Sequence, residues 1–117
     1  MAIFENKGHY LLITADQPYS PEPYLQAMKE AVKLCEQQNL TRILTDIRTV
    51  DKDIPLLDRF KLGTELARLL GAKYKLAILA RAESIDKMGE NAAVNRGARV
   101  FVTASLDEAL SWFDSNS

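Results

Sequence analysis

The stretch that decides the fold is TRILTDIRTVDKDIPLLDRFKLGTELARLLG, residues 41–71. It predicts a buried strand over Arg42–Ile47 with a charged tip, Asp46-Ile47-Arg48, then a polar loop and an amphipathic helix that Gly71 closes. In open α/β sheets, ligand and partner sites gather at the carboxyl ends of strands. The stretch therefore predicts where the protein works, although no residue set in it commits the chain to a reaction.

Outward from this stretch, strand-like and helix-like segments alternate. Ile3–Glu5 and His9–Thr14 predict a β-hairpin that turns at Gly8. The order β-β-α-β-α-β-α-β-α predicts a single α/β domain over residues 1–117, with a mainly parallel (mixed) sheet covered by helices. The other predicted segments are helices from Ser20 to Asn39, from Asp53 and Pro55 to Gly71, from Ser84 to Gly97 and from the capping box at Ser105, and strands at Lys75–Ala80 and Arg99–Thr103.

Composition narrows the class of protein. Fifteen Lys and Arg against sixteen Asp and Glu give a net charge of -1, which provides no overall field for binding nucleic acid. Glu5 and Lys7 interrupt the apolar start, and no apolar run reaches the roughly 18 residues of a membrane span. A single cysteine, Cys35, cannot form an internal disulfide, so we expect a cytoplasmic protein. One histidine and one cysteine argue against a metal site, and no glycine-rich phosphate loop indicates a cofactor.

The chain resembles the SpoIIAA-like group of proteins, which includes the STAS (anti-sigma-factor antagonist) domains. The resemblance rests on the opening hairpin, on TRILTDIR followed by LLDRFKLGTELARLL, on KLAILA, and on NRGARVFVTASLDEALSWF, whose NRG-x-x-V-F and EAL-x-W resemble small bacterial proteins of this group. It implies a SpoIIAA-like fold and a regulatory role through binding of a protein partner.

The resemblance does not extend to the phosphorylation switch. In signalling STAS domains, a serine at the start of the helix after this strand is phosphorylated, which changes binding to a partner kinase. The matching residues 53–58 here read DIPLLD and include neither serine nor threonine. Thr49 lies nearby, but in the loop before the helix.

Four charged residues are the candidate site. Asp46 and Arg48 flank Ile47, so on a strand they point to the same side of the sheet. They could recognise an anion, a backbone loop or a partner, or they could form a local ion pair, with Asp46 capping the loop that follows. Arg59, in the first turn of the second helix, and Arg81, after KLAILA, fall near the same edge. Together with Arg48 they would form a basic rim suited to a phosphate or carboxylate.

Two functions of different classes follow. The first is a non-catalytic regulatory module that binds a protein partner or a second copy of itself, for which the exposed side of the leading hairpin strand and the second helix are candidate surfaces. The alternative is binding or sensing of a small anionic or lipid-like ligand at the carboxyl edge of the sheet. A large cavity would favour the ligand, and a filled core with an exposed apolar patch would favour the partner. A receiver domain, the enzyme-like alternative, would require a lysine after the last strand, and the chain has none there.

Overall fold

The computed structural model describes residues 2–15, 20–49, 55–85 and 88–115 and contains one five-stranded sheet of order β1-β2-β3-β4-β5. The first two strands pair antiparallel, and every later pair is parallel. The predicted fold class, a mixed, mainly parallel α/β sheet that opens with a β-hairpin, is confirmed. The elements are β1 (Ala2–Asn6), β2 (Leu11–Ala15), α1 (Pro21–Gln38), β3 (Arg42–Asp46), α2 (Leu56–Leu70), β4 (Lys75–Leu79), the short 3₁₀ helix η1 (Ala82–Ser84), α3 (Met88–Val94), β5 (Arg99–Thr103) and α4 (Leu106–Phe113).

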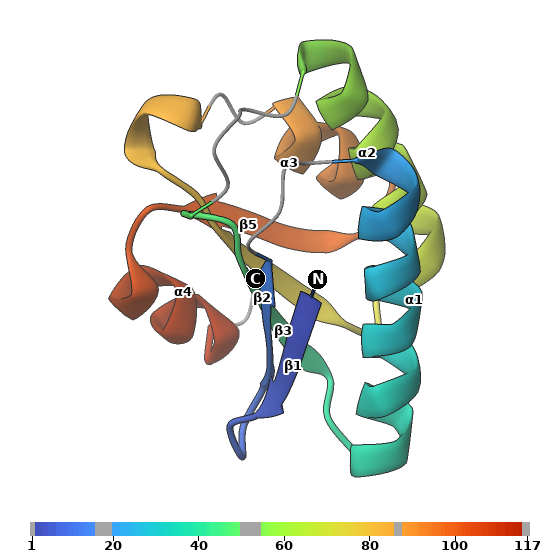
Figure 1. Ribbon diagram of the computed structural model, residues 1–117, viewed down its shortest axis with the longest axis vertical. Helices are drawn as coiled ribbons and strands as arrows, with labels where there is room; N and C mark the ends of the chain where they lie inside the picture. The colour runs from blue at the N-terminus through green and yellow to red at the C-terminus, as the bar shows by residue number, and fades with distance from the viewer. Residues whose placement is uncertain (1, 16–19, 50–54, 86–87, 116–117) are drawn as a thin grey trace.

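The strand order decides which face each helix covers. β2, β3, β4 and β5 follow one another across the sheet in chain order, so each crossover steps in the same direction. Crossovers between parallel strands are right-handed, and three successive steps in one direction therefore place α1, α2 and α3 on the same face. The segment after β5 is not a crossover, and α4 packs on the opposite face (Figure 1).

The alternation of side chains along each strand fills two core layers. Odd-numbered residues of β2 and β3, such as Ile13 and Ile43, face α1–α3, whereas Leu44 faces α4. The layer under α4 is small, because one helix of eight residues covers it. The larger layer includes Leu11, Ile13, Ile43, Leu76 and Val100 with Met28, Cys35, Leu66 and Ala93, and the smaller one consists of Leu44, Ala77 and Leu79 with Ala109 and Phe113.

Local signals in the sequence account for most element boundaries. Gly8 has φ 95°, and its N–H donates to Asn6 Oδ1 at 2.7 Å, which closes the predicted hairpin turn. Asn39 ends α1 with φ 57° and ψ 41°, the left-handed conformation expected there. Ser105 caps α4 by accepting the N–H of Glu108 at 3.2 Å.

α2 ends at Gly71 as predicted, but the conformation of that cap and the start of the third helix differ from the prediction. Gly71 does have a positive φ, 57°, but its ψ of -148° lies outside the left-handed helical region, in a part of the map that only glycine enters readily. Ser84 does not cap the third helix, because the chain leaving β4 first forms η1, and α3 begins at Met88. Asp53, the other predicted start of α2, lies outside the described residues. No helix of the described segments combines the length and the hydrophobicity needed to cross a membrane.

Candidate functional site

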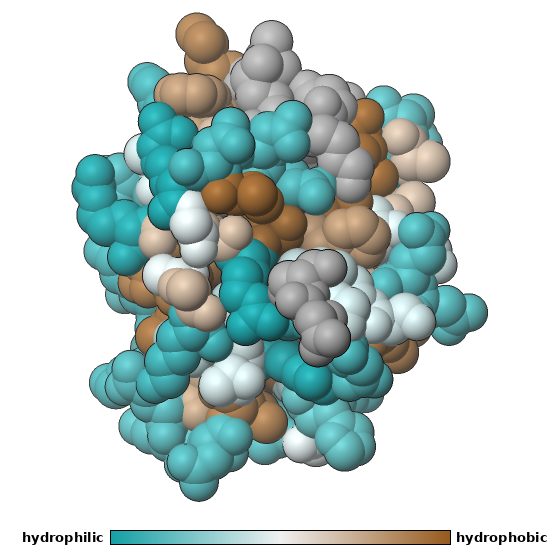
Figure 2. Space-filling view, turned by 180° about the vertical axis from the view of Figure 1, so that it is seen from behind, coloured by the Kyte–Doolittle hydropathy of each residue, from teal (hydrophilic) through white to brown (hydrophobic). Residues whose placement is uncertain are grey.

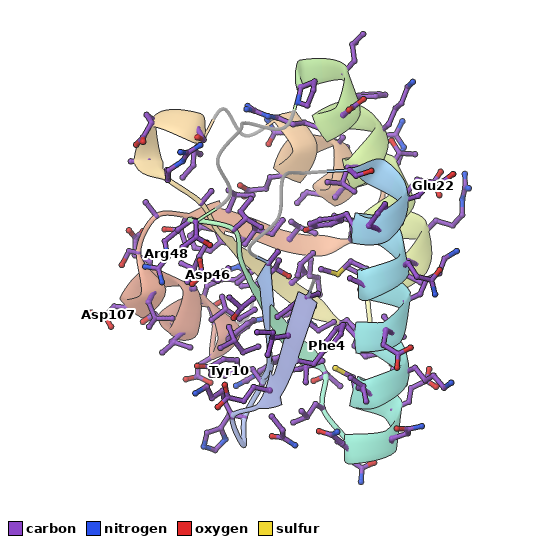
Figure 3. All side chains as sticks on the ribbon, in the orientation of Figure 1. Phe4, Tyr10, Glu22, Asp46, Arg48 and Asp107 are labelled. Atoms are coloured by element: carbon purple, nitrogen blue, oxygen red, sulfur yellow. The ribbon has the colours of Figure 1, made fainter. Side chains whose placement is uncertain are left out.

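Asp46 and Arg48 form a closed pair at the carboxyl end of β3. The Asp46 carboxylate accepts three hydrogen bonds from Arg48: from the backbone N–H at 3.1 Å, from Nε at 3.0 Å and from Nη2 at 2.9 Å. Figure 3 shows both side chains at this end of the sheet, on the side of α4. The structure therefore contains both local interactions that the sequence allowed: the ion pair between the two side chains, and the Asp46 carboxylate that caps the loop.

The pairing changes the titration of both groups. The side-chain hydrogen bonds from Arg48 hold the pKa of Asp46 below its usual range, although partial burial acts in the opposite direction. The pKa of Arg48 is raised, chiefly by the same hydrogen bonds. An anion that bound Arg48 would have to compete with a carboxylate already in bidentate contact. A recognition role for this pair stays a prediction.

Arg81 lies on the neighbouring strand at the corresponding position. Asp46 pairs with Leu79 across β3 and β4, so Arg48 and Arg81 each follow the end of a strand by two residues. Arg59 belongs to a different element: it lies in the first turn of α2, where its N–H donates to Pro55 O at 3.0 Å. The topology thus brings Arg48 and Arg81 to one edge, and a basic rim shared by all three arginines stays a prediction.

Thr49, the hydroxyl nearest to the missing serine, connects two strand ends. Its Oγ1 donates to the backbone carbonyl of Ala15 at 3.2 Å, which ties the chain leaving β3 to the end of β2. The residue is exposed. This hydrogen bond gives Thr49 a structural role at the same edge of the sheet.

Large apolar side chains are exposed next to this edge, on α2 and α3. Leu57 is 75% exposed, Phe60 46% and Val94 47%. The guanidinium carbon of Arg96 lies 5.4 Å from the centre of the Phe60 ring, and Arg96 Nη1 donates to Ala92 O at 3.1 Å. We call Leu57, Phe60, Val94 and Arg96 the α2–α3 surface. Figure 2 shows apolar side chains among hydrophilic ones in the upper half of the rear face, the half that contains α3 and the first turn of α2.

The exposure of Leu57 and Phe60 corrects one reading of the sequence. The apolar residues of the sequence from 56 to 70, Leu57 and Phe60 among them, predict one broad apolar face for this helix, but of these residues Leu66 and Leu70 are buried. Two residues along a helix amount to about 200° of rotation, so Phe60 lies on the opposite side from the buried Leu62. In the sequence, the rotation of each residue about the helix axis, measured from Leu62, could have distinguished the exposed Leu57 and Phe60 from the buried Leu66 and Leu70.

A second cluster, at the amino edge of the sheet, was not anticipated. Lys75 is only 4% exposed, and its Nζ donates to three carbonyl oxygens at the end of α4. The acceptors are those of Trp112 at 2.9 Å, Phe113 at 3.0 Å and Ser115 at 2.7 Å. Arg42, which pairs with Lys75 across the sheet, forms a 2.8 Å ion pair with Asp114. These residues are the Lys75 cluster.

The Lys75 cluster acts on structure rather than on a ligand. The last carbonyl groups of a helix have no partner within it, and the ammonium group of Lys75 supplies three donors for them. Burial lowers the pKa of Lys75, and the nearby charges of Arg99 and Arg42 lower it further. Trp112, whose ring stacks on Phe101 of the edge strand at 5.4 Å, covers the cluster from one side.

The remaining candidates for site chemistry are metal ligands and the single thiol of the chain. Within residues 2–15, 20–49, 55–85 and 88–115, no three His, Cys, Asp or Glu side chains are grouped as metal ligands. Cys35 is fully buried, and this burial raises the pKa of its thiol to about 11. A thiol with that pKa is almost entirely protonated at neutral pH and is a poor nucleophile.

The order of elements and the single direction of the crossovers define a SpoIIAA-like fold, that of the STAS domains. Among solved structures, the chain is similar to the crystal structure of an anti-sigma factor antagonist from Mycobacterium paratuberculosis, with a TM-score of 0.58 over 95% of this chain and 91% of that one. The two sequences are 12% identical, so the likeness concerns the fold. No protein-family model and no curated protein matches the sequence.

Proposed function

We propose that this protein is a non-catalytic regulatory module that binds a protein partner through the α2–α3 surface. The observation that carries the proposal is the exposure of Leu57, Phe60 and Val94 on two adjacent helices. Isolated apolar side chains on a surface are ordinary, but a group of three with an arginine over an aromatic ring has the composition of a protein interface. The similarity of the fold to an anti-sigma factor antagonist supports the same class of function.

The filled core adds support for a protein partner over a small ligand. Met28, Ala31, Cys35 and Ile43 have no exposed surface, and they occupy the space between the sheet and α1. At the carboxyl edge, Asp46 already satisfies the charge of Arg48. The anionic ligand at the carboxyl edge of the sheet, where Arg48 and Arg81 follow neighbouring strands, therefore remains the alternative.

Regulation by phosphorylation at the start of α2 does not form part of the proposal. Residues 53–58 contain no hydroxyl group that a kinase could modify. Thr49 Oγ1 is held by Ala15 O, so its modification would have to break a contact between two strand ends.

Capture of partners by matched surface variants tests this function. Leu57→Ser combined with Phe60→Ser removes the two apolar side chains of α2 while leaving the buried face of the helix intact. Leu106→Ser, at a 39% exposed leucine on α4, is the control of equal chemistry on the opposite face of the sheet. A partner retained by the wild type and by Leu106→Ser, lost by the double variant and cross-linked to α2 or α3, is the expected result. Retention by all three proteins would refute the proposed surface, and a turnover activity in the purified protein would refute the non-catalytic assignment.

A further inference from the structure

From the chemistry of the α2–α3 surface we infer that its partner segment is an amphipathic helix with bulky apolar side chains on one face and carboxylates at the margin of that face. The inference rests on the proposed function, because it names the chemistry of the partner at the same surface. It depends on three observations: the spacing of the apolar side chains, the unpaired cations beside them, and the repulsion between two copies of the surface.

The apolar side chains have the spacing that helix recognition uses. Leu57 and Phe60 are three residues apart on α2, so they are neighbours along one side of the helix, with about 5–6 Å between their Cβ atoms. Val94 lies at the end of α3, whose turn brings Arg96 over Phe60. Exposed apolar side chains on two packed helices can bind a partner helix that has apolar residues at positions i, i+3 or i+4, and i+7.

Two cations beside these apolar side chains have no acidic partner among the residues that the structure describes. Lys61 and Arg96 are exposed, and neither forms an ion pair with any residue in the described part of the chain. In contrast, Arg42 and Arg68 each pair with a carboxylate. The nearest acidic group on the helix, Asp58, lies in the first turn of α2, where the helix dipole stabilises its charge.

The stacking of Arg96 on Phe60 favours a carboxylate as the complement. A guanidinium group held over an aromatic ring keeps donors at its edge, and two parallel N–H donors match the two oxygens of a carboxylate. Lys61 follows Phe60 directly and adds a second positive charge at the margin. Carboxylates at the rim of an interface increase the association rate and select the partner.

A second copy of the protein is a poor partner for the α2–α3 surface, because both copies would bring the same positive charges to the interface. In a symmetric dimer the same patch faces itself, so the positive charges of Lys61 and Arg96 would share one interface with the same two charges of the other copy. Opposed like charges at an interface are unfavourable. The surface is therefore complementary to an acidic segment and not to itself.

Synthetic peptides test the inference directly. The probe is a fluorescein-labelled helical peptide of four turns with leucine at i, i+3 and i+7 and glutamate at the flanking positions. One matched peptide has lysine in place of each glutamate, and another has serine in place of each leucine. Binding is measured by fluorescence anisotropy and mapped by amide shifts in NMR spectra of the full-length protein.

The expected result is binding of the glutamate peptide alone, with shifts at Leu57, Phe60 and the α3 turn. Lys61→Glu with Arg96→Glu should weaken it at least tenfold and allow the lysine peptide to bind. Lys29→Glu with Lys33→Glu, at two exposed lysines of α1, is the matched control and should leave the affinity unchanged. Because all four lysine and arginine positions are exposed, unchanged thermal unfolding confirms that the variants fold.

Several results would overturn the inference. It is overturned if the lysine or serine peptide binds as well as the glutamate peptide, or if the amide shifts are confined to another surface. It is also overturned if about 1 mM glutamate peptide, a concentration at the weak end of specific recognition, causes no amide shift. A concentration-dependent dimer in sedimentation equilibrium that Phe60→Ser abolishes would show a second copy at this surface instead. If a captured partner cross-links to α2 or α3 through a basic or extended segment, the inference fails and the proposed function stands.

Discussion

Replacing Lys75 by Met should destabilise the protein by about 3 kcal/mol. The substitution keeps an unbranched apolar chain of similar length and removes the ammonium group with its three hydrogen bonds of 2.7–3.0 Å. A hydrogen bond to a charged group contributes roughly 1.5–3 kcal/mol, and each carbonyl left without a partner costs about 1 kcal/mol at the low end of the range. The desolvation of the buried ammonium opposes these gains, which is why the sum is well below three full hydrogen bonds.

Urea unfolding at pH 7, followed by circular dichroism and by the fluorescence of Trp112, measures the loss. At roughly 3–6 °C per kcal/mol for a chain of this size, the melting temperature should fall by about 10–15 °C. Lys73→Met is the matched control, because Lys73 is exposed in the turn before β4, and it should change stability by less than about 0.5 kcal/mol. A loss below about 1 kcal/mol for Lys75→Met would refute the reasoning, since it would mean that desolvation cancels the hydrogen bonds.

Three other predictions follow from single contacts. Asp46→Asn should lower stability by about 1 kcal/mol at pH 7. Because the pKa of Asp46 is lowered in the folded protein, the wild-type advantage is present above the unfolded pKa of about 3.9 and should disappear as the pH falls through the folded pKa; a pH-independent difference in urea titrations would contradict this. Cys35, with its thiol pKa near 11, should react with a disulfide reagent at pH 8 only in denaturant, and a reaction in native buffer as fast as in denaturant would show that the thiol is accessible. Ser105→Ala should cost about 1 kcal/mol through loss of the α4 cap, whereas Ser105→Gly should cost only a few tenths; equal losses by thermal unfolding would argue against the cap.

The fold could be predicted because its local signals agree with one another. The apolar run Lys75–Ala80, the left-handed Asn39 and the cap at Ser105 each concern a few neighbouring residues, and the structure contains all three. Alternation of strands and helices then leaves few topologies that satisfy right-handed crossovers. The burial of Cys35 followed from the same periodicity, since it lies on the apolar side of α1.

The Lys75 cluster could not be predicted, because it depends on the register between strands. Arg42, Lys75 and Arg99 occupy paired positions on three neighbouring strands, which only the hydrogen-bonded sheet reveals. A lysine at the start of an apolar strand reads as solvent-exposed in the sequence. It is buried here because α4 returns across the sheet and ends over it.

The candidate site shows why residue type alone misassigns surfaces. Asp46 and Arg48 could have formed either a recognition site or a local ion pair, and the structure joins them to each other; Leu57 and Phe60 were expected on the apolar face of α2, and they are exposed. A charged side chain at a strand end can be satisfied within its own turn, whereas an apolar side chain is buried only if another element lies beneath it. The first turn of α2 stands at the carboxyl end of the sheet (Figure 1), and its outer side has no such element among the described residues. The binding surface that we propose is therefore best sought where the sheet stops supporting the helix, whereas Asp46 and Arg48 at the strand end are bonded to each other.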